Sequence, residues 1–218
     1  HALSVDSARL LPAGPAWHPA QALLWPAGTR MPPAPEPPSR LSSFFRPEEW
    51  RRLCNHFSQQ PSAFANLPHL LASAAELLTL CGLQRFALMF TDRQGQLIAL
   101  HQQGLPAGTP RLTADPGRWP LLPQLVTQSV LVPVSPQRNP GLSKKLPPAI
   151  RERFDERHLV MRGFALGGRN SLVLIGDQQG MPFSDRQLEL LEKTARVIER
   201  GLLAFASRTA QAGGTPAI

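Results

Sequence analysis

The chain lacks tyrosine altogether and has only two cysteines and three lysines among its 218 residues. Without tyrosine, a stacking platform for single-stranded nucleic acid is harder to build. Cys54 and Cys81, spaced as they are, make neither a zinc site nor a disulfide framework, so we expect two buried thiols in a reducing cytoplasm. No apolar run approaches the ~20 residues of a membrane span, so we expect a soluble, cytoplasmic protein without a membrane partner.

Arginine supplies most of the positive charge. The chain has 23 Lys+Arg against 15 Asp+Glu, a formal net charge of +8. Much of the excess lies between Arg138 and Arg169, where eight basic residues face three acidic ones. Two interpretations stay open: an anion pocket for a nucleotide-like ligand, or a solvated basic loop and helix. A nucleic-acid surface is a further alternative, although we do not expect nucleic acid as a partner.

The first third of the chain has three parts. Residues 1–30 are predicted to be helical, residues 31–40 form a proline-rich linker (MPPAPEPP from Met31), and residues 41–62 form a connecting helix that starts near Pro47. Because the chain begins with His1 inside a helical pattern, without a signal sequence, we expect it to be a fragment of a longer protein.

Residues 63–208 alternate between helical and strand patterns. Asn66 can cap the first helix, and Gly82 ends it. The tail at 209–218 is predicted to be disordered. The order predicts an α+β fold, an antiparallel sheet with helices from both ends of the domain against it. The expected helices are 66–81, 119–128, 147–154 and 184–205, and the expected strands are 86–91, 96–102, 129–135 (an edge strand because of Pro133), 159–166 and 171–177.

The last helix has a strong start signal and a regular apolar stripe. Ser184 and Gln187 have the spacing of a capping box, so the polar residues after the last strand need no catalytic role to explain them. Two interpretations remain for the stripe: a helix packed on the sheet, or a seam between two copies in a homodimer. The dimer-seam residues would be Leu188, Leu191, Ile198 and Leu202.

The last predicted strand and helix of residues 63–208 resemble the end of a GAF domain. A final strand (172–177), Gly180, a Phe183-Ser184-Asp185 helix start and a long helix follow in that family's order. The likeness covers about 63–207. The segment from Asn139 to Phe154 is similar to the GAF module that follows HDOD domains in bacterial signalling proteins. Residues 1–30 are similar, more weakly, to the closing helices of an HDOD domain.

The resemblance implies a GAF-like α+β fold and a non-enzymatic bacterial signal-transduction module. Such a module would sense a small ligand or mediate dimerisation, and its partner would be the upstream HDOD region of the same protein. A ligand-free scaffold for protein–protein contacts is the alternative.

The resemblance also implies where a small-molecule or nucleotide ligand would bind, between the sheet and a cap formed by about 103–157. Each candidate also has an ordinary structural interpretation. Asn139, Lys144, Phe154, Asp155 and Glu156 follow the order of a cyclic-nucleotide signature, but Phe154 directly precedes Asp155, so we treat the match as chance. The candidate ligand-binding residues are Trp119, Asn139, Lys144, Arg151, His158 and Arg162.

No residue pattern predicts catalysis or a metal site. Gly167-Gly168 lacks the Gly-Lys-Ser/Thr of a phosphate-binding loop, and scattered Ser, His and Asp residues define no triad. Ligation of haem or a metal by a histidine is possible in GAF relatives, and His101 or His158 could serve in this way here. Nothing in the sequence fixes a second ligand. The sequence therefore names no cofactor.

Overall fold

The computed structural model describes residues 45–59, 64, 66–92, 94–166 and 171–211. The predicted helical remnant (1–30) and proline-rich linker (31–40) lie outside the described residues. No helix in the described ranges is both long enough and apolar enough to span a bilayer.

A single six-stranded sheet forms the centre, in the order β3-β2-β1-β6-β5-β4. Every neighbouring pair is antiparallel, as predicted. β4 lies at one edge, where Pro133 led us to expect it. We did not predict β3, a two-residue strand at the other edge. The strands are β1 (Arg85–Thr91), β2 (Leu97–Gln103), β3 (Thr113–Ala114), β4 (Leu131–Val134), β5 (Leu159–Ala165) and β6 (Ser171–Asp177).

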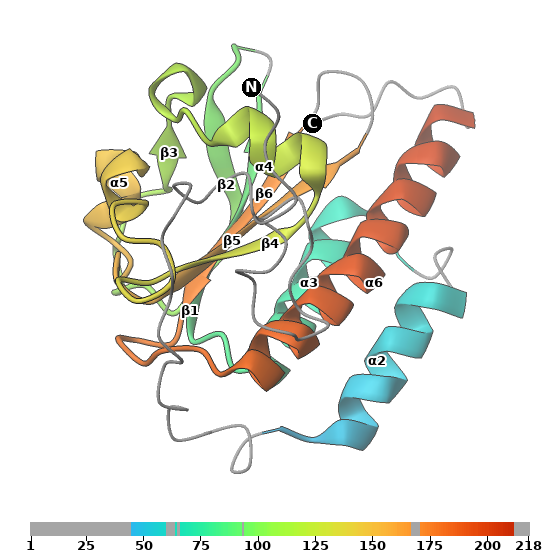
Figure 1. Ribbon diagram of the computed structural model, residues 1–218. Coiled ribbons are helices and arrows are strands. Elements are labelled where there is room, and N and C mark those ends of the chain that lie inside the picture. Colours follow the sequence, from blue (N-terminus) through green and yellow to red (C-terminus); the bar gives the residue numbers. More distant parts are fainter. Residues whose placement is uncertain (1–44, 60–63, 65, 93, 167–170, 212–218) are drawn as a thin grey trace, which may run out of the picture.

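Helices cover both faces of this sheet (Figure 1). α2 (Pro47–Gln59), α3 (Leu67–Leu80) and α6 (Asp185–Gln211) lie side by side on one face. The opposite face is covered by the cap, which contains α4 (Leu122–Gln128), α5 (Pro148–Arg151) and the short 3-10 helices η4 (Pro116–Arg118) and η5 (Ser143–Lys145). β1, β4, β5 and β6 are therefore almost entirely buried, whereas β2 and β3 are partly exposed.

The alternation of side chains along the strands builds two separate cores. Phe86, Leu88 and Phe90 of β1 join the core beneath α2, α3 and α6. Ala87 and Met89, between them in the sequence, join the cap-side core instead. This explains why β1 is almost continuously apolar: neither of its faces meets water.

The predicted helix signals are present in the structure. Ser184 and Gln187 form the capping box: Ser184 N–H donates to Gln187 Oε1 at 3.0 Å, and Gln187 N–H donates to Ser184 Oγ at 3.3 Å. Asn66 Oδ1 accepts from His69 N–H at 2.9 Å. Gly82, with φ of +94°, follows α3, a conformation that glycine adopts without strain.

The dimer-seam interpretation of α6 is wrong for this structure. Leu188, Leu191, Ile198 and Leu202 are all buried within the chain, in the core shared with α3 and the sheet. The same 3-4 spacing serves a helix on a sheet and a helix in a coiled coil, so the sequence could not separate the two. The intramolecular alternative is the one observed.

Two predicted boundaries also change. The connecting helix is part of the domain, because Cys54 and Phe57 of α2 are buried in the core under α6. At Gly201 of α6, an added Cβ would lie 2.6 Å from the Phe57 ring, so α2 and α6 approach closely there. At the other end, α6 continues to Gln211, past the point where we expected disorder.

Another glycine, Gly163, lets the cap approach the sheet closely because it has no side chain. A Cβ on Gly163 of β5 would lie 2.3 Å from the carbonyl oxygen of Leu125 in α4. The predicted helix at 119–128 is shorter than expected: Trp119 follows η4, and α4 starts only at Leu122, with Pro123 in its first turn. A proline early in a short segment favours this later start.

Candidate functional site

Trp119 lies at the centre of the cap-side core. Its side chain is fully buried, with leucines of η4–α4 and residues of α5 in the same apolar cluster. The indole Nε1–H has no hydrogen-bond acceptor among the described residues. Buried indole N–H groups usually find an acceptor. Trp119 therefore lies in the cap-side core, and its role in ligand binding stays a prediction.

Asn139 has a different environment from the one we expected. Its Oδ1 accepts from Ser135 N–H at 2.8 Å, and its Nδ2 donates to the carbonyl of Pro133. A second side chain, Glu192, accepts from Leu131 N–H with its Oε2 at 3.0 Å. Asn139 and Glu192 thus form hydrogen bonds with backbone groups of the edge strand β4. Blocking these groups protects an exposed edge from pairing with another strand. Asn139 therefore serves the sheet edge.

Lys144 and Arg151 lie on the outer surface of the cap. Both are exposed, in η5 and α5 respectively. Other basic residues of the segment are engaged locally: Arg138 pairs with Asp185, and Arg153 Nη1 donates to the carbonyl of Pro110 at 2.5 Å. The solvated-surface interpretation therefore describes Lys144 and Arg151, whereas Arg162 of the same segment is buried.

The two histidines singled out in the sequence lie on different parts of the sheet: His101 is on β2, and His158 directly precedes β5, with β1 and β6 between these strands. His101 stacks on Phe86 with ring centroids 6.0 Å apart. His101 Nε2 and His158 Nδ1 are buried without hydrogen-bond partners among the described residues. In the described ranges, no group of three or more His, Cys, Asp or Glu side chains is arranged to hold a metal ion.

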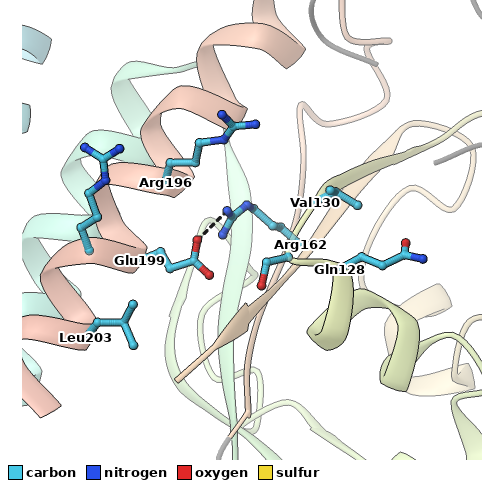
Figure 2. Close-up of a pocket in the computed structure, with 8 residues that line it drawn as sticks. Gln128, Val130, Arg162, Arg196, Glu199 and Leu203 are labelled. Carbon is cyan, nitrogen blue, oxygen red and sulfur yellow. Dashed lines mark hydrogen bonds and ion pairs between the residues drawn. The ribbon is translucent and has the colours of Figure 1, made fainter. Parts of the chain in front are cut away.

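Arg162 lies on the opposite face of the sheet from Trp119. It is 1% exposed, and its Nη2 donates to Glu199 Oε2 at 2.9 Å, while its Nε lies 3.4 Å from Glu192 Oε2. Figure 2 shows its guanidinium directed from the strand towards Glu199 on α6. The six candidate residues therefore do not share one pocket. The alternation of β5 decides this: Leu159 and Met161 face the cap, so Arg162 faces α6.

A pocket of about 350 Å³ surrounds Arg162 (Figure 2). It lies between α6 and the junction of α4 with β4. Sequence reasoning missed it, because its residues come from three separate segments and share no motif. The walls include Ser129, Val130, Arg196, Arg200 and Leu203.

Neither thiol lines the pocket, and both belong to the core on the opposite side of the sheet from Trp119. Cys54 and Cys81 are free and buried in α2 and immediately after α3, as the sequence predicted. Burial raises the pKa of Cys54 to about 11 and that of Cys81 to about 12. Cys81 Sγ also lies 3.0 Å from Thr194 Oγ1. Thiols with such a raised pKa stay protonated at neutral pH and are weak nucleophiles.

Comparisons with known proteins identify the fold. No family model matches the sequence, and no curated protein matches it. Among solved structures, the GAF domain of a phosphoenolpyruvate-protein phosphotransferase from Coxiella burnetii has a TM-score of 0.51 and 14% identity, covering 80% of this chain and 99% of that one.

Two further structures are similar at lower TM-scores. One is the GAF domain/HD domain protein from Geobacter sulfurreducens (TM-score 0.48, 16% identity, 72% of this chain and 98% of that one). The other is free methionine-R-sulfoxide reductase from Neisseria meningitidis in complex with its substrate (TM-score 0.48, 17% identity, 73% and 91%). The likeness to the Coxiella burnetii domain shows that the α+β fold is GAF-like, as predicted. At these identities the likeness shows the fold alone.

Proposed function

We propose that the chain is a non-enzymatic signal-transduction module: a GAF-like regulatory domain that binds a small molecule under its cap. The observation that carries this proposal is the Trp119 indole N–H, which is buried in an otherwise apolar core and has no acceptor in the part of the chain that the structure describes. A ligand with one hydrogen-bond acceptor on a mainly apolar body would satisfy it. The exposed positions of Lys144 and Arg151 favour such a ligand over a highly charged one.

The packing of the terminal helices supports a regulatory role. Trp50 Nε1 on α2 donates to Thr194 Oγ1 on α6 at 2.8 Å, and Phe57 packs at Gly201. The two helices at the ends of the described domain, α2 and α6, therefore contact each other, and α6 contacts the sheet. A ligand that favours one arrangement of the cap would shift the population of helix arrangements, and α2 would pass that shift to an upstream HDOD region.

Native mass spectrometry of the purified chain, without added ligand, tests the binding proposal. We expect a co-purifying small molecule in the native chain. Trp119→Phe, which keeps an apolar ring but removes the N–H donor, should lose most of it. Arg118→Gln, an exposed neighbour, is the matched control and should retain it. A native chain that is free of ligand and binds none from a cell extract would contradict the proposal.

Hydrogen exchange tests the transmission step. Adding the molecule found by mass spectrometry to the stripped chain should slow or speed amide exchange in α2 and α6. If a ligand binds saturably and leaves both helices unchanged, the regulatory mechanism is wrong even though binding is right.

A ligand-free scaffold is the second candidate, and the dense cap favours it. Leu142, Leu146, Ile150 and Phe154 are buried in the space between cap and sheet. Under this proposal the domain acts through protein–protein contacts, including a homodimer, on surfaces other than the buried stripe of α6. Light scattering across a hundredfold concentration range distinguishes the candidates: an apo dimer favours the scaffold, and a ligand-bound monomer favours the sensor.

A further inference from the structure

The pocket beside α6 has a buried guanidinium that is only partly satisfied. Arg162 has five N–H donors. Only the bond from Nη2 to Glu199 has an ordinary length, 2.9 Å. The contacts from Nε to Glu192 and from Nη1 to the carbonyl of Gly163 are 3.4 and 3.5 Å. Buried donors are normally paired, so the N–H groups of Arg162 that have no partner among the described residues are available to an acceptor in the pocket.

The pocket also carries an excess of positive charge. Arg196 Nε is bound to Glu192 Oε1 at 2.8 Å, and Arg196 remains more than half exposed. Arg200, on the same helix, makes no ion pair with any residue that the structure describes. Three arginines and one glutamate, Glu199, therefore line the pocket, and Glu192 pairs with two of these arginines. An anion at the mouth would be attracted to this cluster.

An apolar surface adjoins the charged one. Leu203 lines the pocket and is 39% exposed, and Val130 lies on the wall formed by the start of β4. A volume of about 350 Å³ suits a small molecule. The combination of arginine donors with an exposed leucine fits a ligand that has a charged head and a short apolar group.

We propose that this pocket binds a small organic oxyanion, with its carboxylate or phosphate head on Arg162, Arg196 and Arg200 and its apolar group on Leu203. The site lies on the opposite face of the sheet from Trp119 and does not depend on the cap ligand. It joins β5, α6 and the α4–β4 junction, so an occupant contacts the same helix that packs on α2.

NMR titration of the ¹⁵N-labelled chain with three probes tests the proposal. The probes are inorganic phosphate, phenyl phosphate and benzoate, followed through the arginine Nε–Hε signals and the Leu203 amide. We expect saturable shifts with phenyl phosphate or benzoate, and weaker binding of inorganic phosphate, because it lacks the apolar group. A preference for phenyl phosphate identifies a phosphate site, and a preference for benzoate identifies a carboxylate site.

Variants on the exposed side of α6 make the test specific without disturbing the fold. Arg200→Gln should weaken the better probe about tenfold, as expected for loss of one charge-assisted hydrogen bond. Leu203→Asn should remove the preference for that probe over inorganic phosphate. Arg186→Gln removes an equal charge from the first turn of α6, outside the pocket, and should change neither. Trp119→Phe should also leave this binding unchanged.

The proposal is overturned if none of the probes gives saturable shifts at these residues. It is equally overturned if Arg200→Gln has no effect, or if Arg186→Gln weakens binding as much as Arg200→Gln does. In that last case the probes respond only to the overall charge of the chain.

Discussion

Arg85 on β1 donates two hydrogen bonds to the fully buried carboxylate of Asp177 on β6, from Nε to Oδ1 at 2.9 Å and from Nη2 to Oδ2 at 2.6 Å. The hydrogen bond to Asp177 raises the pKa of the Arg85 guanidinium. Asp177 also accepts from Asp155 N–H at 2.7 Å and from Gln179 N–H at 2.9 Å. One side chain thus joins two strands to the loops that precede β5 and follow β6, so the end of the last strand is structural.

Asp177→Asn should destabilise the fold strongly. The amide nitrogen would replace an oxygen that accepts hydrogen bonds, and Arg85 would lose its counter-charge. We expect a loss of about 3 kcal/mol in the free energy of unfolding, as for other disrupted buried ion pairs, measured by urea unfolding with circular dichroism. Asp115→Asn is the control: it is an exposed cap of Gly117 N–H whose side-chain oxygen can still accept, so its unfolding midpoint should stay close to that of the native chain.

Leu191→Ala distinguishes a core residue from a dimer contact. Leu191 is fully buried within the chain, so we expect a loss of about 3 kcal/mol in unfolding free energy, independent of protein concentration. Leu203→Ala, at the exposed leucine of the same helix, should cost little. The dimer-seam interpretation would be correct after all if the unfolding midpoint of the native chain rose with protein concentration and that of Leu191→Ala did not.

Gly163→Ala should loosen the cap. Its new Cβ would be 2.3 Å from the carbonyl oxygen of Leu125, so α4 would have to move away from β5. We expect a loss of about 2 kcal/mol, typical of overpacking, and faster amide exchange in α4. Gly117→Ala meets only the flexible Asp115 side chain, at 3.2 Å, and serves as the control. Equal stability of the two variants would show that the close approach is not rigid.

The buried thiols should make the fold sensitive to alkaline pH. Burial raises their pKa from 9.0 to about 11 for Cys54 and about 12 for Cys81, so the unfolded chain releases these protons first. The protonated thiols therefore make their full contribution to the free energy of unfolding below pH 9, and this contribution declines as the pH rises above 9. The chain has no tyrosine, and its three lysines are exposed, so few other groups contribute in this range.

The measurement is urea unfolding at pH 8, 9, 10 and 10.5. The double variant Cys54→Ala/Cys81→Ala loses packing at every pH, but its stability should fall less steeply above pH 9 than that of the native chain. Parallel slopes for the two proteins would mean that the thiols are not the cause.

Local signals in the sequence predicted most of the elements because their causes are local. The capping box at Ser184, the cap at Asn66 and Gly82 act within one helical turn, and the alternation of apolar residues in the strands acts between neighbours. The element order then limited the fold to an antiparallel α+β arrangement. β3 escaped prediction because two residues carry no periodicity.

Patterns in the sequence were sufficient to predict the two hairpins, the long helix and the GAF-like order, since each rests on contacts between residues close in the chain. The partner that each apolar or charged face meets became known from the folded structure alone. The stripe of α6 met its own sheet rather than a second copy, Asn139 met the backbone of β4, and Arg162 met Glu199, 37 residues away, on the side opposite Trp119. Periodicity gives the direction of a side chain relative to its neighbours, whereas its partner depends on how distant segments are brought together.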